Sequence, residues 1–316
     1  MANLLRYSII LLCLVARPAL ASAPTPLACD TCEIQRILLI HPAVEAPYDL
    51  IVEHVRAGLA RGAQRPVESY TLPDAETDPR LAQWLTKRRT HSAIVTIGRQ
   101  ALDAVTATAT DIPVFAAAVE QPPSDEVNGI SIFIAPQRFF ETLSAIAPHI
   151  TTVHVIYLSD KAQTLMPSIN AAGRIHGINV VAAGVNNLRD AVITTEKLLD
   201  NMQHGEAMWL HRGVIRLNEE VMMPLIVSKS WRLRVPVFTS DAEYVKRGLL
   251  FSLFPDYEGM GISLGERLGS DQLPLPQGLE FLTTTKGVLN MRIARHLDVK
   301  PKRSTLNRFE IIFPVK

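Results

Sequence analysis

The stretch VPVFTSDAEYVKRGLLFSLFPDYEGMGISLGERL, residues 235–268, decides the fold. It predicts a strand of β-branched and aromatic residues at 235–238, a polar turn, and a short helix that ends at Gly248. A second apolar strand follows at 249–254, and a break at Pro255 leads into a helix containing several glycines. Because the first helix is too short to cover much of a sheet, we expect the chain to reach a sheet edge here and cross into a neighbouring lobe.

The same alternation of short apolar strands and amphipathic helices runs through the rest of the chain. Continuous apolar strands separated by helices predict mostly parallel sheets that are covered on both faces. Two successive sets of such units favour two doubly wound, Rossmann-like α/β lobes joined by hinge strands. The further expected strands are 37–40, 69–72, 93–97, 112–118, 129–134, 153–158, 180–182, 207–210, 279–282 and the short run 309–313.

Helices are expected from the spacing of apolar residues between these strands. The first has a predicted core face of Leu50, Val52, Val55 and Leu59 and closes at Gly62. A later one has a predicted core face of Leu165, Ile169, Ala172 and Ile175. The remaining expected helices lie around 81–85 and at 99–108, 137–147, 188–202, 217–231 and 286–297.

The first 21 residues predict a secretory signal peptide. Arg6 precedes an apolar run at 9–15, and Ala19-Leu20-Ala21 matches an A-x-A cleavage site. The apolar run is too short to span a bilayer. We therefore expect cleavage near Ala21 and a periplasmic location for the mature chain.

The charge balance of the chain bears on two classes of partner. Without Arg6 and Arg17, the 32 basic residues of the chain become 30 against 31 acidic ones, a formal net charge of −1. Such a balance gives no support for binding to nucleic acid or to an anionic membrane surface. About half of the residues, 47%, are apolar, which is enough for two packed cores.

Two cysteines, Cys29 and Cys32, precede the first strand in the order CDTC. In an oxidising compartment they are candidates for a disulfide that acts as a local staple. Haem attachment requires histidine at the position that Glu33 occupies, and a thioredoxin-like role would place the motif after a strand rather than before it. We favour the staple over redox or metal chemistry.

Motifs for catalysis, metals and cofactors are missing from the sequence. It contains no H-E-x-x-H pair, no G-x-S-x-G elbow and no phosphate-binding loop of the G-x-x-x-x-G-K-[ST] type. His154 lies within an apolar strand and is interpreted as a core residue. The glycines of 259–265 resemble a dinucleotide fingerprint, but their last spacing is one residue too long, which favours helix packing. We predict no enzyme activity, no metal and no cofactor.

Ligand-binding candidates follow strands in the first half of the chain, because open α/β sheets bind ligands at the carboxyl ends of their strands. Gly98, Arg99 and Gln100 begin a helix, whose free N–H groups and guanidinium could hold a carboxylate. A solvated first-turn side chain is the other interpretation of Arg99. Glu120 follows the next strand and is a candidate for contact with a positive group.

The second half supplies equivalent candidates. Ser159, His211, Arg212, Ser240 and Asp241 occupy the turns after three of its strands. Either Ser240 or Asp241 could instead be a helix N-cap. Polar residues thus follow the strands of both lobes. This pattern predicts a ligand-binding cleft between the two lobes.

Tyr257 is a further candidate ligand contact, expected near the hinge. Together with the turns of both halves it completes the residues that we expect to meet a ligand.

Several stretches of the chain resemble the family of ABC-transporter substrate-binding proteins that includes tryptophan- and tyrosine-type binders. The similar segments are 94–98 (IVTIG), 112–115 (IPVF), 128–131 (NGIS), 207–210 (AMWL), 235–238 (VPVF), 245–250 (VKRGLL), 256–261 (DYEGMG) and 289–295 (LNMRIAR). The resemblance implies a type I periplasmic binding protein fold, in which the chain crosses between lobes three times, near residues 135, 253 and 280. Lobe 1 would then contain 33–135 plus 254–280, and lobe 2 would contain 136–253 plus 281–316.

The same resemblance implies a periplasmic solute-binding protein of an ABC-type uptake system. It would bind an amino acid or small carboxylate by hinge closure and present it, as a monomer, to an inner-membrane permease. Arg99-Gln100 and His211-Arg212-Gly213 depart from the family pattern and favour a more anionic ligand or a different partner. The alternative is an accessory protein that senses a ligand for a sensor kinase or an outer-membrane receptor, without a role in transport.

Overall fold

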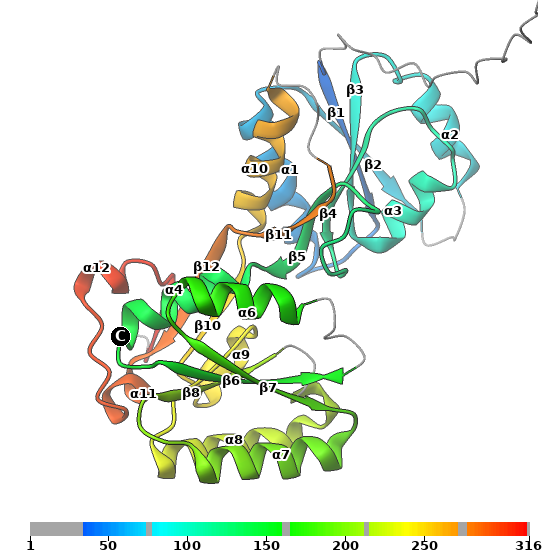
Figure 1. Ribbon diagram of the computed structural model, residues 1–316. Coiled ribbons are helices and arrows are strands. Elements are labelled where there is room, and N and C mark those ends of the chain that lie inside the picture. The colour runs from blue at the N-terminus through cyan, green and yellow to red at the C-terminus, as the bar shows by residue number, and fades with distance from the viewer. Residues whose placement is uncertain (1–33, 74–77, 160–164, 212–214, 271–276, 315–316) are drawn as a thin grey trace, which may run out of the picture. The chain divides into compact units, whose positions relative to one another are not determined.

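The computed structural model describes residues 34–73, 78–159, 165–211, 215–270 and 277–314 (Figure 1). The expected signal peptide, the cysteines Cys29 and Cys32, and Arg212 lie outside the described residues. Within residues 33–316 the strands form one sheet of six strands and one of seven. Most strand pairs are parallel, which confirms the predicted α/β architecture of two doubly wound lobes.

The first sheet has the strand order β11-β5-β4-β3-β1-β2, and all of its neighbouring strands are parallel. Its interior strand β3 is buried at every position, as its continuous run of small and apolar residues predicts. The strands are β1 Arg36–Pro42, β2 Val67–Leu72, β3 Ser92–Ile97, β4 Val114–Val119, β5 Gly129–Ile134 and β11 Leu279–Leu282.

Helices cover both faces of this sheet. Apolar residues of α1 (Asp49–Ala63) and α10 (Tyr257–Gly269) share one buried cluster with the sheet. Those of α2 (Pro79–Thr86) and α3 (Gly98–Thr106) share clusters with it on the opposite face. The first sheet and its four helices therefore form a three-layer unit.

The glycines of α10 serve close helix packing, as the sequence predicted. A Cβ added at Gly265 would lie 2.7 Å from the backbone oxygen of Leu59 on α1. One added at Gly269 would lie 2.6 Å from the backbone oxygen of Ala63. Because real Cβ atoms do not approach backbone atoms this closely, only glycine permits the observed approach of the two helices.

The second sheet has the order β13-β12-β10-β9-β8-β6-β7, with β10 and β12 antiparallel and the other neighbours parallel. Its strands are β6 Thr152–Leu158, β7 Asn179–Val185, β8 Glu206–Leu210, β9 Val237–Thr239, β10 Phe251–Pro255, β12 Thr285–Asn290 and β13 Ile311–Phe313. The chain passes between the two sheets three times, after β5, after β10 and after β11.

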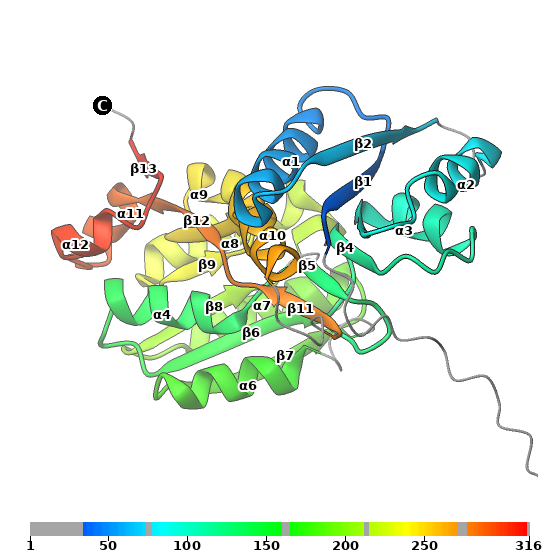
Figure 2. The same ribbon diagram turned by 90° about the horizontal axis from the view of Figure 1, so that it is seen from above.

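Helices again lie on both faces of the second sheet (Figures 1 and 2). Residues of α4 and α6 form one buried cluster with the sheet, and residues of α7, α8 and α9 form another on the opposite face. These helices are α4 Pro136–Ile146, α6 Met166–Ile175, α7 Leu188–Asn201, α8 Glu219–Leu233 and α9 Ala242–Arg247. The shorter elements are the 3₁₀ turn Ile215–Leu217 and the helices α11 Met291–His296 and α12 Arg303–Leu306.

Two expectations about the end of the second lobe were wrong. The segment expected as one helix at 286–297 is divided into strand β12 and helix α11, because Lys286 to Leu289 pair with β10. For the same reason β10 is an interior strand and not the expected sheet edge: β12 and β13 lie beyond it. The predicted crossing after β10 itself is present.

Two residues assigned to helix core faces are in fact exposed. Leu50, in the first turn of α1, is 55% exposed, and Ile175, at the last position of α6, is 71% exposed. At a helix end the apolar face no longer lies over the sheet, so spacing alone assigns such residues wrongly. Their neighbours Val55 and Ile169 are buried as predicted.

Candidate ligand-binding site

Strand β8 directs a tryptophan into the cluster between the second sheet and helices α4 and α6. Side chains alternate along a strand, so Met208 and Leu210 enter the cluster on the α7 and α8 face. Trp209, between them, joins the opposite cluster and is 2% exposed. A ring of this size at the end of a strand determines the shape of the space beside it.

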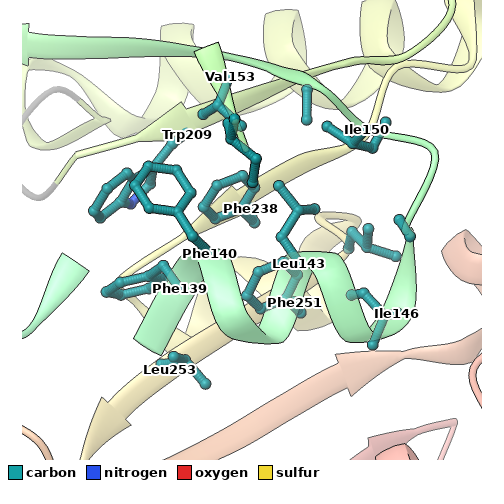
Figure 3. Packing of buried hydrophobic residues seen from close by; sticks show 14 of the residues in the cluster. Phe139, Phe140, Leu143, Ile146, Ile150, Val153, Trp209, Phe238, Phe251 and Leu253 are labelled. Carbon is teal, nitrogen blue, oxygen red and sulfur yellow. The ribbon is translucent and has the colours of Figure 1, made fainter. Parts of the chain in front are cut away.

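Aromatic rings surround Trp209 (Figure 3). The ring centroid of Phe139, on α4, lies 4.6 Å away, and that of Phe140 lies 5.7 Å away in an edge-on orientation. On β9, Phe238 stacks with Trp209 at 5.7 Å. Pairs at these separations add packing energy beyond their buried area.

A pocket of about 40 Å³ opens beside these rings, where the strands that pass between the sheets meet the ends of β8 and β9. One water molecule needs roughly 10–15 Å³, so the pocket has room for one end of a small ligand. Its lining is mostly apolar and aromatic, as in most small-molecule sites. The lining residues are Ile132, Phe133, Ile134, Pro136, Phe139, Leu165, Ile169, Trp209, His211, Ser240, Pro255 and Phe281.

The indole N–H of Trp209 has no hydrogen-bond acceptor among the described residues, although it is buried. Leaving a buried donor unpaired costs about 1–3 kcal/mol. An acceptor atom of a ligand bonded to this group would recover that free energy.

Two of the residues predicted from the sequence, His211 and Ser240, line this pocket. Each residue directly follows a strand. Because open α/β sheets bind ligands at the carboxyl ends of their strands, both could be predicted from the sequence. The His211 ring stacks on Phe133 with centroids 6.5 Å apart and is 6.3 Å from Trp209. Imidazole and hydroxyl groups thus supply the polar part of an otherwise aromatic pocket.

The first-lobe candidates lie elsewhere, at the start of α3. Gly98 has φ +75°, and an added Cβ there would meet nothing within 4 Å. The Arg99 guanidinium is exposed and already paired, with Asp103 at 2.9 Å and with the side-chain oxygen of Gln121 at 3.0 Å. Gln100 is exposed beside it. These three positions form a polar surface that does not line the pocket.

The four remaining described candidates either have a role in the fold or lie away from the pocket. The Asp241 carboxylate accepts the backbone N–H of Glu243 and is the N-cap of α9, the alternative that the sequence left open. Glu120 is exposed after β4, and Tyr257, at the first position of α10, packs against the first-lobe core. Ser159 lies beside the edge strand β7, where its hydroxyl would contact a Cβ added at Gly184. None of the four lines the pocket.

Sequence reasoning missed the apolar majority of the lining. Phe133 and Phe281 belong to strands β5 and β11, and Trp209 was treated as part of a framework motif. Polar residues at strand ends are visible in the sequence as binding candidates, whereas these rings lie within strands. Strand alternation could have placed Trp209 on the α4 face, but not beside Phe133, which comes from a distant part of the chain.

Neither a metal-binding cluster nor a membrane-spanning helix occurs among the described residues. They contain no group of three or more histidine, cysteine, aspartate or glutamate side chains placed to hold a metal ion. Nor does any helix in the same ranges combine the length and apolar character needed to cross a membrane.

Two doubly wound α/β lobes, connected by three passes of the chain and with a pocket where those passes occur, define the type I periplasmic binding protein fold. The family comparison agrees: the profile described as ABC transporter substrate binding protein matches residues 40–306. The chain belongs to this family. Among curated protein sequences, no match to the chain was found.

Three solved structures illustrate the similarity of fold. The ABC domain in complex with L-Trp from Streptococcus pneumonia is 20% identical, with TM-score 0.51, over 88% of this chain and 99% of that one. The ligand-free, open structure of CD0873, a substrate-binding protein with adhesive properties from Clostridium difficile, is 16% identical, with TM-score 0.62, over 87% and 98%. A mutant XylFII–LytSN complex is 14% identical, with TM-score 0.53, over 81% and 97%.

Proposed function

We propose that this chain is the exported solute-binding component of an ABC-type uptake system and binds an amino acid or small carboxylate between its lobes. The observation that carries the proposal is the aromatic pocket at the junction of the inter-sheet strands with β8 and β9. Family membership supports the transport role, and the sequence pattern of residues 1–21 supports export to the periplasm.

The pocket favours a ligand with a flat or apolar part. Phe133, Phe139 and Trp209 supply aromatic surface, while the unpaired indole N–H and the side chains of His211 and Ser240 supply polar contacts. An amino acid with an apolar side chain would meet both requirements. The structural relative that was solved with L-Trp is consistent with this class of ligand.

The charged end of the ligand requires a second set of contacts. Arg99 and the free N–H groups at the start of α3 form the first-lobe group that we propose for the carboxylate. Contacts to both lobes would stabilise a closed arrangement relative to an open one, because a ligand shifts a conformational equilibrium by its difference in affinity for the two states.

The test is a thermal-shift screen of amino acids, small carboxylates and short peptides on the mature chain. A ligand at a hundred times its dissociation constant should add about 2.7 kcal/mol to the free energy of unfolding. For the best compound, Trp209→Phe should weaken binding about tenfold, because it removes one hydrogen bond worth about 1.5 kcal/mol. Affinities are measured by isothermal titration calorimetry.

The matched control is Trp84→Phe, which makes the same change at a half-buried tryptophan of α2 that does not line the pocket. It should leave affinity unchanged. If no compound in any of the three classes stabilises the chain, the proposed class of ligand is wrong. Equal affinity of the Trp209→Phe variant and the unsubstituted chain would remove the pocket from the binding site.

The second candidate is a sensing protein that passes its ligand state to a membrane receptor. Its support is the similarity of fold to a protein that was solved within the XylFII–LytSN complex. Purification of the ligand-loaded chain with detergent-solubilised membranes from its own cells distinguishes the two functions. Recovery of a permease supports uptake, whereas recovery of a receptor or kinase supports sensing.

A further inference from the structure

A second pocket, called the distal pocket below, lies at the opposite end of the second sheet from the aromatic pocket. Its lining includes Gly248, just before β10, together with Asn290 and Phe313, the last residues of β12 and β13. The aromatic pocket lies beside Ser240 and Pro255, at the other ends of β9 and β10. The two pockets share no lining residue, so the distal pocket needs an explanation of its own.

The distal pocket has the size and the walls of a small-molecule site. Its volume is about 840 Å³, and sites for small organic ligands usually measure about 300–1,000 Å³. Apolar walls come from segments that are far apart in the sequence: Val227 and Trp231 of α8, Ile293 of α11 and Phe313 of β13. The fold therefore brings together an apolar surface against which the body of a ligand can be buried.

One of these walls, Trp231, is exposed and held in position by a neighbour. Its exposed fraction is 39%. The His296 ring stacks on the indole with centroids 3.7 Å apart and planes 3° apart. His296 Nε2 also donates a hydrogen bond of 2.7 Å to the Trp231 backbone oxygen. Because His296 does not line the pocket, it orients the indole without occupying the space that a ligand would use.

The charge of the distal pocket is of one sign. Among the lining residues that the structure describes, every charged side chain is basic: Lys246, Arg247 and Arg292. Lys246 pairs with Glu243 at 2.8 Å, and Arg247 pairs with Glu219. No described carboxylate forms an ion pair with Arg292, whose guanidinium lies 5.6 Å from the centre of the tryptophan ring. The pocket thus combines apolar walls with one positive charge that is not compensated.

We propose that the distal pocket binds a monocarboxylate with an apolar body, with the carboxylate on Arg292 and the body against Val227, Trp231 and Phe313. A guanidinium binds a carboxylate through two parallel hydrogen bonds. One uncompensated positive charge matches the single negative charge of such a ligand. A cationic ligand would instead meet three basic side chains, and a neutral one would leave the guanidinium of Arg292 without a partner.

This site goes beyond the proposed uptake function and does not depend on it. The transported ligand is assigned to the aromatic pocket, at the carboxyl ends of β8 and β9, whereas the distal pocket lies within the second lobe alone. Occupation of one pocket therefore does not exclude occupation of the other.

The experiment is isothermal titration calorimetry of the mature chain with decanoate. Decanoate should bind, and decylamine, with the same tail and a positive head, should not. Butyrate should bind at least about tenfold more weakly, because its shorter tail buries less apolar surface.

Two arginine variants test the charged contact. Arg292→Gln should weaken decanoate binding about tenfold or more, the loss expected for a charge-assisted hydrogen bond. Arg295→Gln is the matched control, because Arg295 is an exposed arginine of the same helix that does not line the pocket. It should bind decanoate like the unsubstituted chain.

Trp209→Phe distinguishes the two pockets and should leave decanoate affinity unchanged. Decanoate binding that is weakened by Trp209→Phe but not by Arg292→Gln would place the compound in the aromatic pocket. That result overturns the distal site and leaves the proposed uptake function standing. The proposal is also overturned if decanoate does not bind, or if decylamine binds as tightly as decanoate.

Discussion

At the scale of single residues, Glu68 shows how a half-buried carboxylate is used in this fold. It lies on the edge strand β2, 2.6 Å from the Arg88 guanidinium and 3.3 Å from that of Arg36. The hydrogen bond from Arg88 is the main reason that the pKa of Glu68 is lowered from its ordinary value, and both arginine charges add to the effect. Arg88 also lies over the ring of Trp84, at 4.4 Å.

We predict that Glu68→Gln lowers the free energy of unfolding at neutral pH by about 1 kcal/mol, the upper range for partly exposed ion pairs. Because the pKa is lower in the folded state, the stabilisation is fully present above the unfolded value of about 4.3. It is lost as pH falls through the folded pKa. The difference from the unsubstituted chain should therefore shrink below about pH 4.3.

The measurement is urea unfolding at several pH values. Glu126→Gln, at an exposed position in the loop after β4, is the control for a general change in net charge. A difference between Glu68→Gln and the unsubstituted chain that stays constant from neutral to acidic pH would contradict the assigned cause.

Single residues also show the limit of prediction from sequence. His211 and Ser240 could be assigned to a pocket because each directly follows a buried strand. Trp209 could not be assigned to the pocket in this way, since the pocket beside it is also formed by Phe133 and Phe139, which come from other segments of the chain. Contacts between distant segments are set by packing and leave no local pattern.

At the scale of elements, α1 and α10 depend on each other's glycines. In an isolated helix, replacing glycine with alanine is favourable by about 0.8–1.0 kcal/mol. At Gly265 the added Cβ would lie 2.7 Å from the Leu59 oxygen and 2.8 Å from the Ala63 nitrogen, so the helices would have to separate. We predict that Gly265→Ala destabilises the fold by about 1–3 kcal/mol, as overpacking does.

Chemical denaturation of Gly265→Ala measures this effect, and Glu266→Ala, at an exposed position on the same helix, is the control. The two variants should differ clearly in their free energies of unfolding. A stabilised Gly265→Ala variant would show that helix propensity outweighs the close packing seen here.

Element boundaries were predicted well wherever local chemistry sets them. Gly248 ends α9 with φ +128°, and Asp256 caps α10 through the Gly259 N–H, so both breaks were visible in the sequence. Strand β12 was not visible in the sequence, because its pairing with β10 joins residues far apart in the chain. The cap of α11 offered a signal that was not used: the Asn290 side chain accepts the N–H groups of Arg292 and Ile293.

At the scale of the whole molecule, the connectivity decides how a ligand could act on both lobes. The chain passes between its two sheets three times, and residues of all three passes, Ile134, Pro255 and Phe281, line the pocket. A ligand in that pocket would therefore contact the segments on which any change of lobe arrangement depends. Binding and closure should be coupled for this reason.

Closure can be tested with the ligand found by thermal shift. We predict that saturating ligand reduces the radius of gyration measured by small-angle X-ray scattering. We also predict that Arg99→Ala weakens binding about tenfold or more, since a charge-assisted hydrogen bond contributes about 1.5–3 kcal/mol. Arg89→Ala is the matched control: Arg89 is an exposed arginine of the same lobe, paired with Asp111 and away from the start of α3.

The two variants separate the roles of the lobes. If Arg99 holds the ligand's charged group, Arg99→Ala should lose affinity and reduce compaction, because it removes the charged first-lobe contact that favours the closed state. Trp209→Phe keeps the first-lobe contacts, so at saturating ligand it should still compact. Unchanged affinity in Arg99→Ala would mean that its pairing with Asp103 and Gln121 is its whole role. The carboxylate would then have to be bound by a different group.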